Sequence, residues 1–329
     1  MTIEISEDEL ALRTLVDFGD HPSGFLALNE GTERFTAAGL RGFIAYRRSG
    51  RYLIQFGGPF APAEDRMPLL ARFIDLAATE RRKVVAIQLQ RADAERYAEV
   101  GFTVNQVGAT YALDLDGFTL RGTRFMRLRN KMSRARRSGL RVIETTTEEC
   151  TALTSIDKRW LRSKGRHVKE IEFLVGQVGG PMQAHRRLFV GLLEGEPVAY
   201  ISYSPVYGER PGWLHDLSRR LPDVAPGTME TINAAAIEAF RAAGTRWLHF
   251  GFTPFTGLDP ALEVSGASPM VGRFIRLLAA HGAAVYPAKS QVSYKEKWGD
   301  LLVLPEYLAF YGRPRIGGIW QILRTSKSL

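Results

Sequence analysis

The stretch that decides the fold class runs from Trp213 to Phe252 and reads WLHDLSRRLPDVAPGTMETINAAAIEAFRAAGTRWLHFGF. Its beginning, Trp213–Leu217, and its end, Trp247–Phe252, predict two strands. Between them, Gly227–Ala243 has the apolar periodicity of a helix. A strand, a helix and a second strand in this order predict a mixed α/β domain.

The elements on either side of this stretch extend the prediction to the whole second half. We expect a helix over Glu148–Lys164, a hairpin of Leu188–Leu193 with Pro197–Ser204, a helix over Val271–Ala280 and a strand over Gln291–Lys297.

The first half repeats this order of elements. A helix within the first 20 residues is followed by a hairpin of Gly42–Tyr46 with Tyr52–Phe56 and a helix over Met67–Thr79. Then come a strand at Val84–Leu89, a helix at Asp93–Val100, and two strands, Phe102–Val107 and Ala109–Leu115. The repeat predicts an α/β (α+β) protein of two similar domains in tandem, 1–145 and 146–329, each with a mixed central sheet flanked by helices.

The composition excludes several classes of protein. Hydrophobic residues make up 45% of the chain and charged residues 24%, which excludes a disordered or collagen-like chain. Cys150 is the single cysteine, and the six histidines lack paired metal-ligand spacing, so we expect no disulfide and no metal site. The longest uncharged stretch has 14 residues, whereas a membrane-spanning helix needs about 20. The acidic N-terminus does not resemble a signal peptide, and we expect a cytoplasmic protein.

The net charge of +9 arises from one segment, Arg121–Arg141, which carries nine basic residues and no acidic one. Apolar residues recur there at helical spacing, which predicts a helix that buries one side. The predicted anion-binding residues on its other sides are Arg124, Arg127, Arg129, Lys131, Arg134, Arg136 and Arg137. A solvated linker helix would be expected to intersperse glutamates, so we expect this helix to bind a polyanion or an anionic membrane surface.

Several motifs resemble those of a known family. The motifs are Phe118–Gly122, Leu128–Asn130, Trp160–Leu161, Lys164–Gly165, Glu172–Phe173, Asp216–Arg219, Pro222–Glu230, Gly251–Leu258 and Tyr294–Trp298. In this order they resemble the C-terminal domain of lysyl-phosphatidylglycerol synthases, the multiple peptide resistance factors. The resemblance spans about residues 118–308. It implies two tandem domains of the acetyltransferase-like (GNAT) fold and transfer of an amino acid from aminoacyl-tRNA to an acceptor hydroxyl, usually on phosphatidylglycerol.

The resemblance also implies partners. Charged tRNA would be the co-substrate, with no further cofactor, and the basic helix would bind it. The sequence contains no membrane-spanning flippase domain, unlike full-length members, so a lipid, another small molecule or a metabolite amine stays open as the acceptor. Peripheral contact of the protein with an anionic membrane is compatible with each of these acceptors.

Transfer of an amino acid from tRNA needs no covalent nucleophile on the protein, because the aminoacyl ester is already activated. The protein must position the acceptor molecule, remove its proton and stabilise the oxyanion. Asp216, on a predicted strand, is expected to hold the α-ammonium group or to act as general base. Arg219 is expected to stabilise the oxyanion or bind a phosphate. A buried structural carboxylate and a surface ion pair are the alternatives for these two residues.

Lys295 and Lys297 alternate along the last predicted strand, so we expect both on one face, in one cleft with Asp216. Lys297 is the preferred catalytic cation, and Lys295, Glu172 and Glu230 are expected to bind substrate. An exposed strand face is the alternative for the lysines. Glu230 opens a helix and would also favour that helix's dipole.

Two other functions stay open. An acyl-CoA-dependent N-acyltransferase of the GNAT class would hold pyrophosphate on a Gln/Arg-x-x-Gly-x-Gly/Ala loop, and neither Arg219–Gly227 nor Gln55–Pro59 has that glycine spacing. A nucleic-acid-binding protein without enzymatic activity would explain the basic helix but not the motifs after residue 150.

Overall fold

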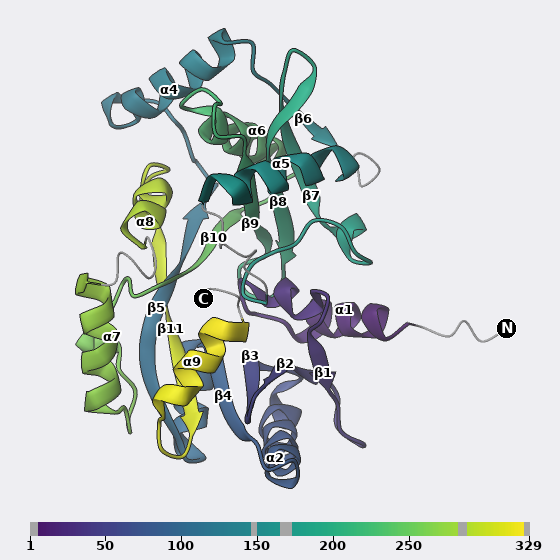
Figure 1. Cartoon of the computed structure of the whole chain (residues 1–329), viewed down its shortest axis with the longest axis vertical. Helices are drawn as coiled ribbons and strands as arrows, with labels where there is room; N and C mark the ends of the chain where they lie inside the picture. The colour runs from purple at the N-terminus through teal and green to yellow at the C-terminus, as the bar shows by residue number, and fades with distance from the viewer. Residues whose placement is uncertain (1–5, 146–149, 165–172, 282–287, 326–329) are drawn as a thin grey trace, which may run out of the picture.

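The computed structural model describes residues 6–145, 150–164, 173–281 and 288–325. Within them, the strands form one mixed sheet in the order β1-β2-β3-β4-β11-β5-β10-β9-β8-β7-β6 (Figure 1). Helices flank this sheet, so the predicted α/β class is confirmed. In the described residues, no helix is long and apolar enough to cross a bilayer.

The first half of the chain supplies one end of the sheet. Its elements are α1 (Glu7–Phe18), the 3-10 turn η1 (Gly24–Leu28), β1 (Glu33–Phe35), β2 (Phe43–Ser49), β3 (Tyr52–Phe60), α2 (Ala63–Thr79), β4 (Lys83–Leu89), α3 (Arg91–Glu99) and β5 (Phe102–Asp114). β5 is one strand that runs through Gly108, where the sequence predicted two. The predicted hairpin is present, and Gly50 has the positive φ of 54° that its tight turn requires.

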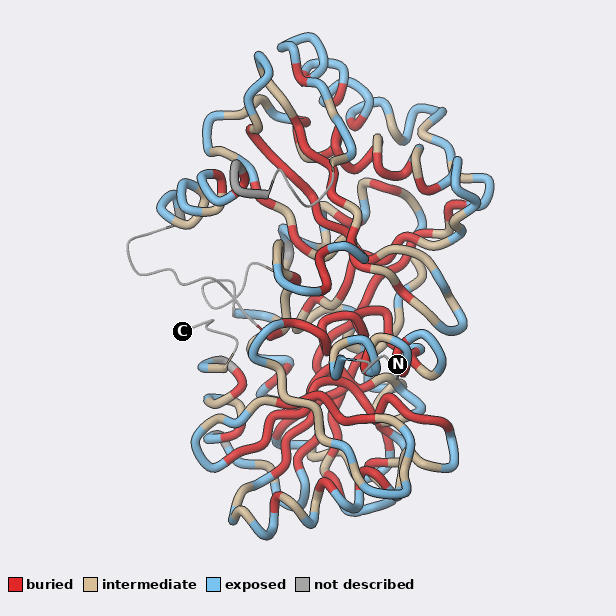
Figure 2. Tube along the Cα trace, turned by 90° about the vertical axis from the view of Figure 1, so that its right-hand side faces the viewer, coloured by how far each residue is buried: buried red, intermediate tan, exposed pale blue. Residues whose placement is uncertain are grey.

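Both faces of this end are covered. Leu69, Leu70 and Phe73 of α2 and Tyr97 of α3 pack on one face. The other face packs against α1 and η1, together with two helices from the end of the chain, α7 (Pro269–His281) and α9 (Ile316–Thr325). Figure 2 shows the result: the buried residues follow the strands, and the outer helices and turns are exposed.

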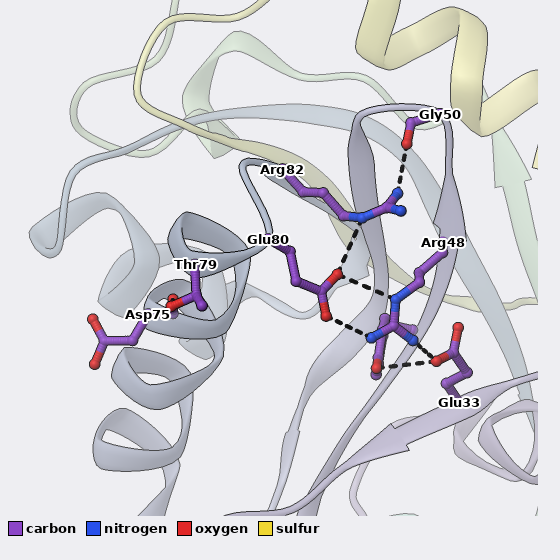
Figure 3. A network of polar contacts seen from close by, with 8 residues as sticks. Glu33, Arg48, Gly50, Asp75, Thr79, Glu80 and Arg82 are labelled. Carbon is purple, nitrogen blue, oxygen red and sulfur yellow. Dashed lines mark hydrogen bonds and ion pairs between the residues drawn. The ribbon is translucent and has the colours of Figure 1, made fainter.

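A polar network fixes the edge of this end (Figure 3). Glu80, just after α2, accepts hydrogen bonds from Arg48 of β2 and lies 3.1 Å from Arg82. Arg48 also pairs with Glu33 of β1, and Arg82 donates to the carbonyl of Gly50 at 2.5 Å. The network therefore joins β1, the hairpin and the end of α2.

The chain from α4 onward supplies the other end of the sheet, and also β11, which lies between β4 and β5. Its elements are α4 (Met126–Arg137), β6 (Arg141–Thr145), α5 (Cys150–Lys164), β7 (Arg187–Leu193), β8 (Glu196–Val206), β9 (Gly212–Arg220), α6 (Thr228–Ala242), β10 (Trp247–Pro254), α7, α8 (Ala288–Glu296), β11 (Leu302–Tyr311) and α9. α4 and α6 pack on one face of this end, with residues of α8, and α5 packs on the other.

The predicted strand Gln291–Lys297 is wrong, because the described part of this segment is the helix α8. Val292 and Tyr294 alternate as in a strand, but Tyr294 and Trp298 are also one helical turn apart, and all three pack into the same apolar cluster. The strand lies further on, in β11. It crosses back into the first half and pairs with both β4 and β5.

The basic helix is shorter than predicted. A 3-10 turn, Thr123–Phe125, precedes α4, and Arg141 begins β6 instead of ending the helix. The apolar stripe is confirmed, since Leu128, Met132 and Ala135 are buried.

β5 pairs with β10 across the middle of the sheet and joins the two halves. The boundary between residues 145 and 146 stays a prediction.

Candidate functional site

The parallel strands β9 and β10 separate in the middle of the molecule. They pair only through Gly212–Leu214 and Trp247–His249. Beyond these residues β9 continues against β8, and β10 continues against β5. We call the place where they separate the β9–β10 fork, formed by β9 from His215 onward and β10 from Phe250 onward. The facing backbone edges there have no strand partner among the described residues, so their polar groups need other partners.

Both strands carry a bulge directly at the fork. On β9, His215 pairs with Tyr203 and Leu217 with Ser202, which leaves Asp216 as the extra residue. On β10, Phe250 is the extra residue next to Gly251, whose φ is +69°. A bulge bends its strand and re-aims a side chain. The fork and the direction of the Asp216 side chain therefore have the same cause.

Asp216 lies in a closely fitted polar pocket. Its carboxylate accepts hydrogen bonds from the Ser204 hydroxyl of β8 and from the Gly176 backbone. A Cβ atom on Gly176 would lie 2.1 Å from the carboxyl carbon, so only glycine fits there. Burial raises the pKa of Asp216, while the Arg186 charge and these two hydrogen bonds oppose the rise.

Arg186 is the cation beside this carboxylate, and it is only 6% exposed. Its Nη2 donates to Asn29 at 3.0 Å, and its guanidinium lies 5.0 Å from the ring centre of Phe25. Its Nε and Nη1 have no hydrogen-bond partner within the described residues. Such donors are chemically suited to an anionic or carbonyl oxygen.

Lys295 lies on the other side of the fork. It is 4% exposed and donates to the Gly251 carbonyl and the Thr253 hydroxyl of β10, both at 2.6 Å. Glu306 of β11 is buried nearby, and neither of its carboxylate oxygens has a hydrogen-bond partner in the described chain. Burial lowers the pKa of Lys295 to about 7 and raises that of Glu306 to about 8, each opposed by the other's charge.

His215 directly precedes Asp216 on β9, and its ring faces Tyr294 of α8. Its Nδ1 lies 3.2 Å from the amide oxygen of Asn233, which also accepts from Tyr203. Because an amide oxygen only accepts, we assign the ring hydrogen to Nδ1, which leaves the lone pair on Nε2. Burial lowers the pKa of His215 to about 4, so its ring is neutral at pH 7.

Lys297, just beyond α8, pairs with the buried Glu230 of α6 at 3.0 Å and lies over the ring of Tyr294. The expected shared face of Lys295 and Lys297 is wrong, since Lys295 turns into the sheet and Lys297 toward α6. The structure also does not bring Lys297 to Asp216. His215 and Tyr203 face α6 and α8, whereas Asp216 and Ser204, the next residues on each strand, point to the opposite face.

Arg219 packs against α5. Its guanidinium lies 4.0 Å from the Trp160 ring centre, and its Nε lies 4.0 Å from Asp157. Burial raises the pKa of Asp157, and hydrogen bonding to Tyr200 opposes this. These contacts favour a role for Arg219 in docking α5 on the sheet.

The exposed face of α4 and the turn before it carry the predicted anion-binding residues. Arg124 pairs with Asp300 at 2.9 Å, and Arg129 donates to the carbonyls of Leu120 and Gly122. The others are exposed, and in the described residues no carboxylate pairs with them; they are Arg127, Lys131, Arg134, Arg136 and Arg137.

The whole arrangement matches one family of known proteins. Residues 13–310 match the family described as phosphatidylglycerol lysyltransferase, C-terminal. The chain belongs to this family. The bifunctional lysylphosphatidylglycerol biosynthesis protein LysX of Mycolicibacterium gilvum is 23% identical over 94% of this chain, and the phosphatidylglycerol lysyltransferase of Bacillus subtilis is 24% identical over 78% of it. The chain spans 29% of the length of each of these relatives.

Solved structures of the lysyltransferase family share the fold. The L-PGS structure from Bacillus licheniformis has a TM-score of 0.79 at 22% identity, covering 98% of this chain and 96% of that one. The C-terminal domain of a putative lysylphosphatidylglycerol synthetase from Agrobacterium fabrum has a TM-score of 0.76 at 22% identity, covering 94% and 93%. The expected tandem GNAT-like fold is confirmed.

Within this phosphatidylglycerol lysyltransferase fold, the fork brings together some predicted residues and some that the sequence did not indicate. Asp216 and Lys295 lie on its two sides. Arg186, His215 and Glu306 were missed, because nothing in their local sequence distinguishes them from other polar residues. Glu172 lies outside the described residues. In the described chain, no group of histidine, cysteine, aspartate and glutamate side chains is arranged to hold a metal.

Proposed function

We propose that this chain moves an amino acid from a charged tRNA to a hydroxyl group of phosphatidylglycerol. The observation that carries the proposal is the fork in a chain of the phosphatidylglycerol lysyltransferase family: Asp216 lies on one face of the sheet, and His215 and Lys295 lie on the other. An aminoacyl group placed between the separated strands would reach both faces. The names of the LysX and lysyltransferase relatives support phosphatidylglycerol as the acceptor.

Two contacts support α4 as the tRNA-binding element. Gly227, at the start of α6, lies against the carbonyl of Lys131 in α4, and a Cβ there would be 2.2 Å from that oxygen. Glu230, in the first turn of the same helix, pairs with Lys297 beyond α8. The helix that carries the unpaired cations thus packs against α6, which pairs through Glu230 with Lys297 beside the fork. Phosphates bound by these arginines would leave the aminoacyl end of tRNA close to the fork.

The groups at the fork match the needs of aminoacyl transfer. We assign to Asp216 the α-ammonium group of the amino acid, because a buried carboxylate is stabilised by a cation. The acceptor oxygen attacks the ester carbonyl carbon, and its proton passes to Nε2 of neutral His215. Lys295 stabilises the resulting oxyanion. The bond to the ribose oxygen of tRNA then breaks, and that oxygen takes the proton from His215.

The remaining predicted residues take supporting roles in this proposal. Lys297 and Glu230 hold α8 against the start of α6, and Arg219 holds α5 on the sheet. None of the three is required to touch the reacting atoms.

The test is to incubate the protein with a mixed pool of charged tRNAs and phosphatidylglycerol, and to analyse the lipids by mass spectrometry. The proposal predicts a lipid heavier by one amino acid residue, formed only with charged tRNA. A second arm replaces charged tRNA with acetyl-CoA. Acetylated product in that arm, without aminoacylated lipid in the first, would favour the acyl-CoA alternative and contradict the proposal.

A further inference from the structure

The helix α7 buries one side against the sheet and exposes a stripe of apolar residues on its outer side. Val271 and Ile275 are buried against the sheet. On the outer side, Met270 is 67% exposed, Phe274 40% and Leu277 56%. These three residues are four and three positions apart, so they lie on one face of the helix. A helix on a soluble surface normally presents polar residues there, so this stripe indicates a contact that the described chain does not supply.

The charges on α7 identify the kind of partner. Arg273 and Arg276 are exposed along one flank of the stripe, His281 ends the helix, and Pro269–His281 contains no aspartate or glutamate. No carboxylate of the described residues forms an ion pair with either arginine. An apolar face bordered by arginines is the pattern of a helix that lies in the interface of an anionic bilayer.

α1 provides a contrast on the same molecule. It also exposes large apolar side chains, Leu10 at 58% and Val16 at 51%. These side chains lie among Glu7, Glu9 and Asp17, whose charges an anionic lipid surface would repel. Exposed apolar area alone therefore does not distinguish the two helices, but charge does.

The position of α7 connects it to the fork. It follows β10 in the chain, which forms one side of the fork, and precedes α8, which supplies Lys295. Figure 1 shows α7 at the outer edge of the molecule, beside the first-half end of the sheet.

We propose that α7 docks this protein onto an anionic lipid bilayer, parallel to the surface. Met270, Phe274 and Leu277 enter the acyl region, while Arg273 and Arg276 bind lipid phosphates. The inference rests on the proposed function in one respect, that the acceptor is a phospholipid of such a bilayer.

The test is co-sedimentation with vesicles in the absence of tRNA. We expect the protein to bind vesicles of phosphatidylglycerol and phosphatidylcholine, and to bind pure phosphatidylcholine vesicles far more weakly. The triple variant Met270→Ser, Phe274→Ser, Leu277→Ser should lower the affinity at least about tenfold. The variant Arg273→Gln, Arg276→Gln should lower it about tenfold or more and remove the preference for the anionic lipid.

The matched control is Leu10→Ser, Val16→Ser on α1, which should leave vesicle binding unchanged. A second measurement uses the single cysteine: in a Cys150→Ser background, an environment-sensitive fluorophore is attached at Phe274→Cys or, as control, at Val16→Cys. Fluorescence should shift to the blue with anionic vesicles only at position 274.

Undiminished binding by the α7 triple variant would overturn the inference, as would equal binding to both kinds of vesicle. Loss of all binding on reversal of the α4 charges, with the α7 variants unaffected, would assign the membrane contact to α4 instead. The readout is independent of transfer. Vesicle binding through α7 without aminoacyl transfer would contradict only the proposed function. Transfer to vesicle lipid by the triple variant at the normal rate would contradict only the α7 inference.

Discussion

At the scale of residues, the fork places ionisable groups where burial shifts their pKa values. Burial raises the pKa of Asp216 and Glu306 and lowers that of His215 and Lys295. Such shifts are common where acids, bases and cation-binding groups act. Of the five fork residues, the sequence indicated Asp216 and Lys295 through their motifs. Arg186 precedes β7, His215 is on β9 and Glu306 is on β11, and only the pairing of distant strands places them at the fork, which local sequence does not reveal.

Asp216→Asn keeps the size of the side chain and removes its charge. If Asp216 holds the α-ammonium group, single-turnover transfer from charged tRNA should fall by about 10²–10⁴. Binding of tRNA should be unchanged, because α4 is untouched. The matched control is Asp93→Asn in the first half. Burial also raises the pKa of Asp93, which packs against Gly58 as Asp216 packs against Gly176. Equal loss of transfer in both variants would contradict the assignment.

Glu306→Gln tests the buried charge by the pH dependence of stability. The pKa of Glu306 is raised from about 4.5 to about 8, so the folded protein binds the proton more tightly than the unfolded chain. The stability from this group is complete below about pH 4.5 and is lost as pH rises through 8. Between pH 5 and 8, the wild-type free energy of unfolding should fall relative to the variant by up to about 1.4 kcal/mol per pH unit. Urea unfolding at several pH values measures this, and parallel curves would contradict it.

At the scale of elements, the sequence pattern predicted most of the helices and the strands β2–β5, but it missed β1 and α9 and gave α8 as a strand. Errors arose where one pattern fits two structures. Val292 and Tyr294 suited a strand, yet α8 forms because Tyr294 and Trp298 pack together one turn apart. β11 was missed because it contains Pro305 and because its partners, β4 and β5, lie about 200 residues earlier.

Reversing the charge of Arg127, Lys131 and Arg134 to Glu should weaken tRNA binding strongly. Wild-type affinity should fall with salt, and each lost phosphate contact should reduce the slope of log affinity against log salt by about 0.7–0.9. The fold should survive because the three side chains are exposed. Reversal of three other exposed residues, Arg51, Arg72 and Arg81, changes the net charge equally and should leave binding nearly unchanged. Equal effects would show that only net charge matters.

Gly227→Ala tests the packing of α4 on α6. Gly227 and Gly244 both have positive φ, 100° and 74°, so alanine strains either backbone by about 1–2 kcal/mol. Only Gly227 lies against Lys131, whereas a Cβ on Gly244 meets nothing within 4 Å. Gly227→Ala should therefore lower the free energy of unfolding more than Gly244→Ala, and should also weaken tRNA binding. Chemical denaturation of both variants measures the difference, and equal losses would contradict the packing role.

At the scale of the whole molecule, the repeated element order predicted the tandem fold, and the motifs predicted the family. They did not predict that one sheet runs through both halves or that β11 returns to the first half between β4 and β5. Long-range pairing of this kind depends on contacts between distant segments, which periodicity does not encode. The consequence for function is that groups from both halves, such as Asn29 and Arg186, meet beside Asp216.

The most direct test of the account is single-turnover transfer by the wild-type chain. The protein, in excess, is mixed with tRNA charged with a radiolabelled amino acid and with phosphatidylglycerol, and label is followed in tRNA and in lipid. The account predicts that label leaves tRNA and appears in lipid at the same rate, and that acetyl-CoA neither replaces charged tRNA nor slows the reaction. Label that stays on tRNA, with robust acetyl transfer from acetyl-CoA under the same conditions, would contradict it.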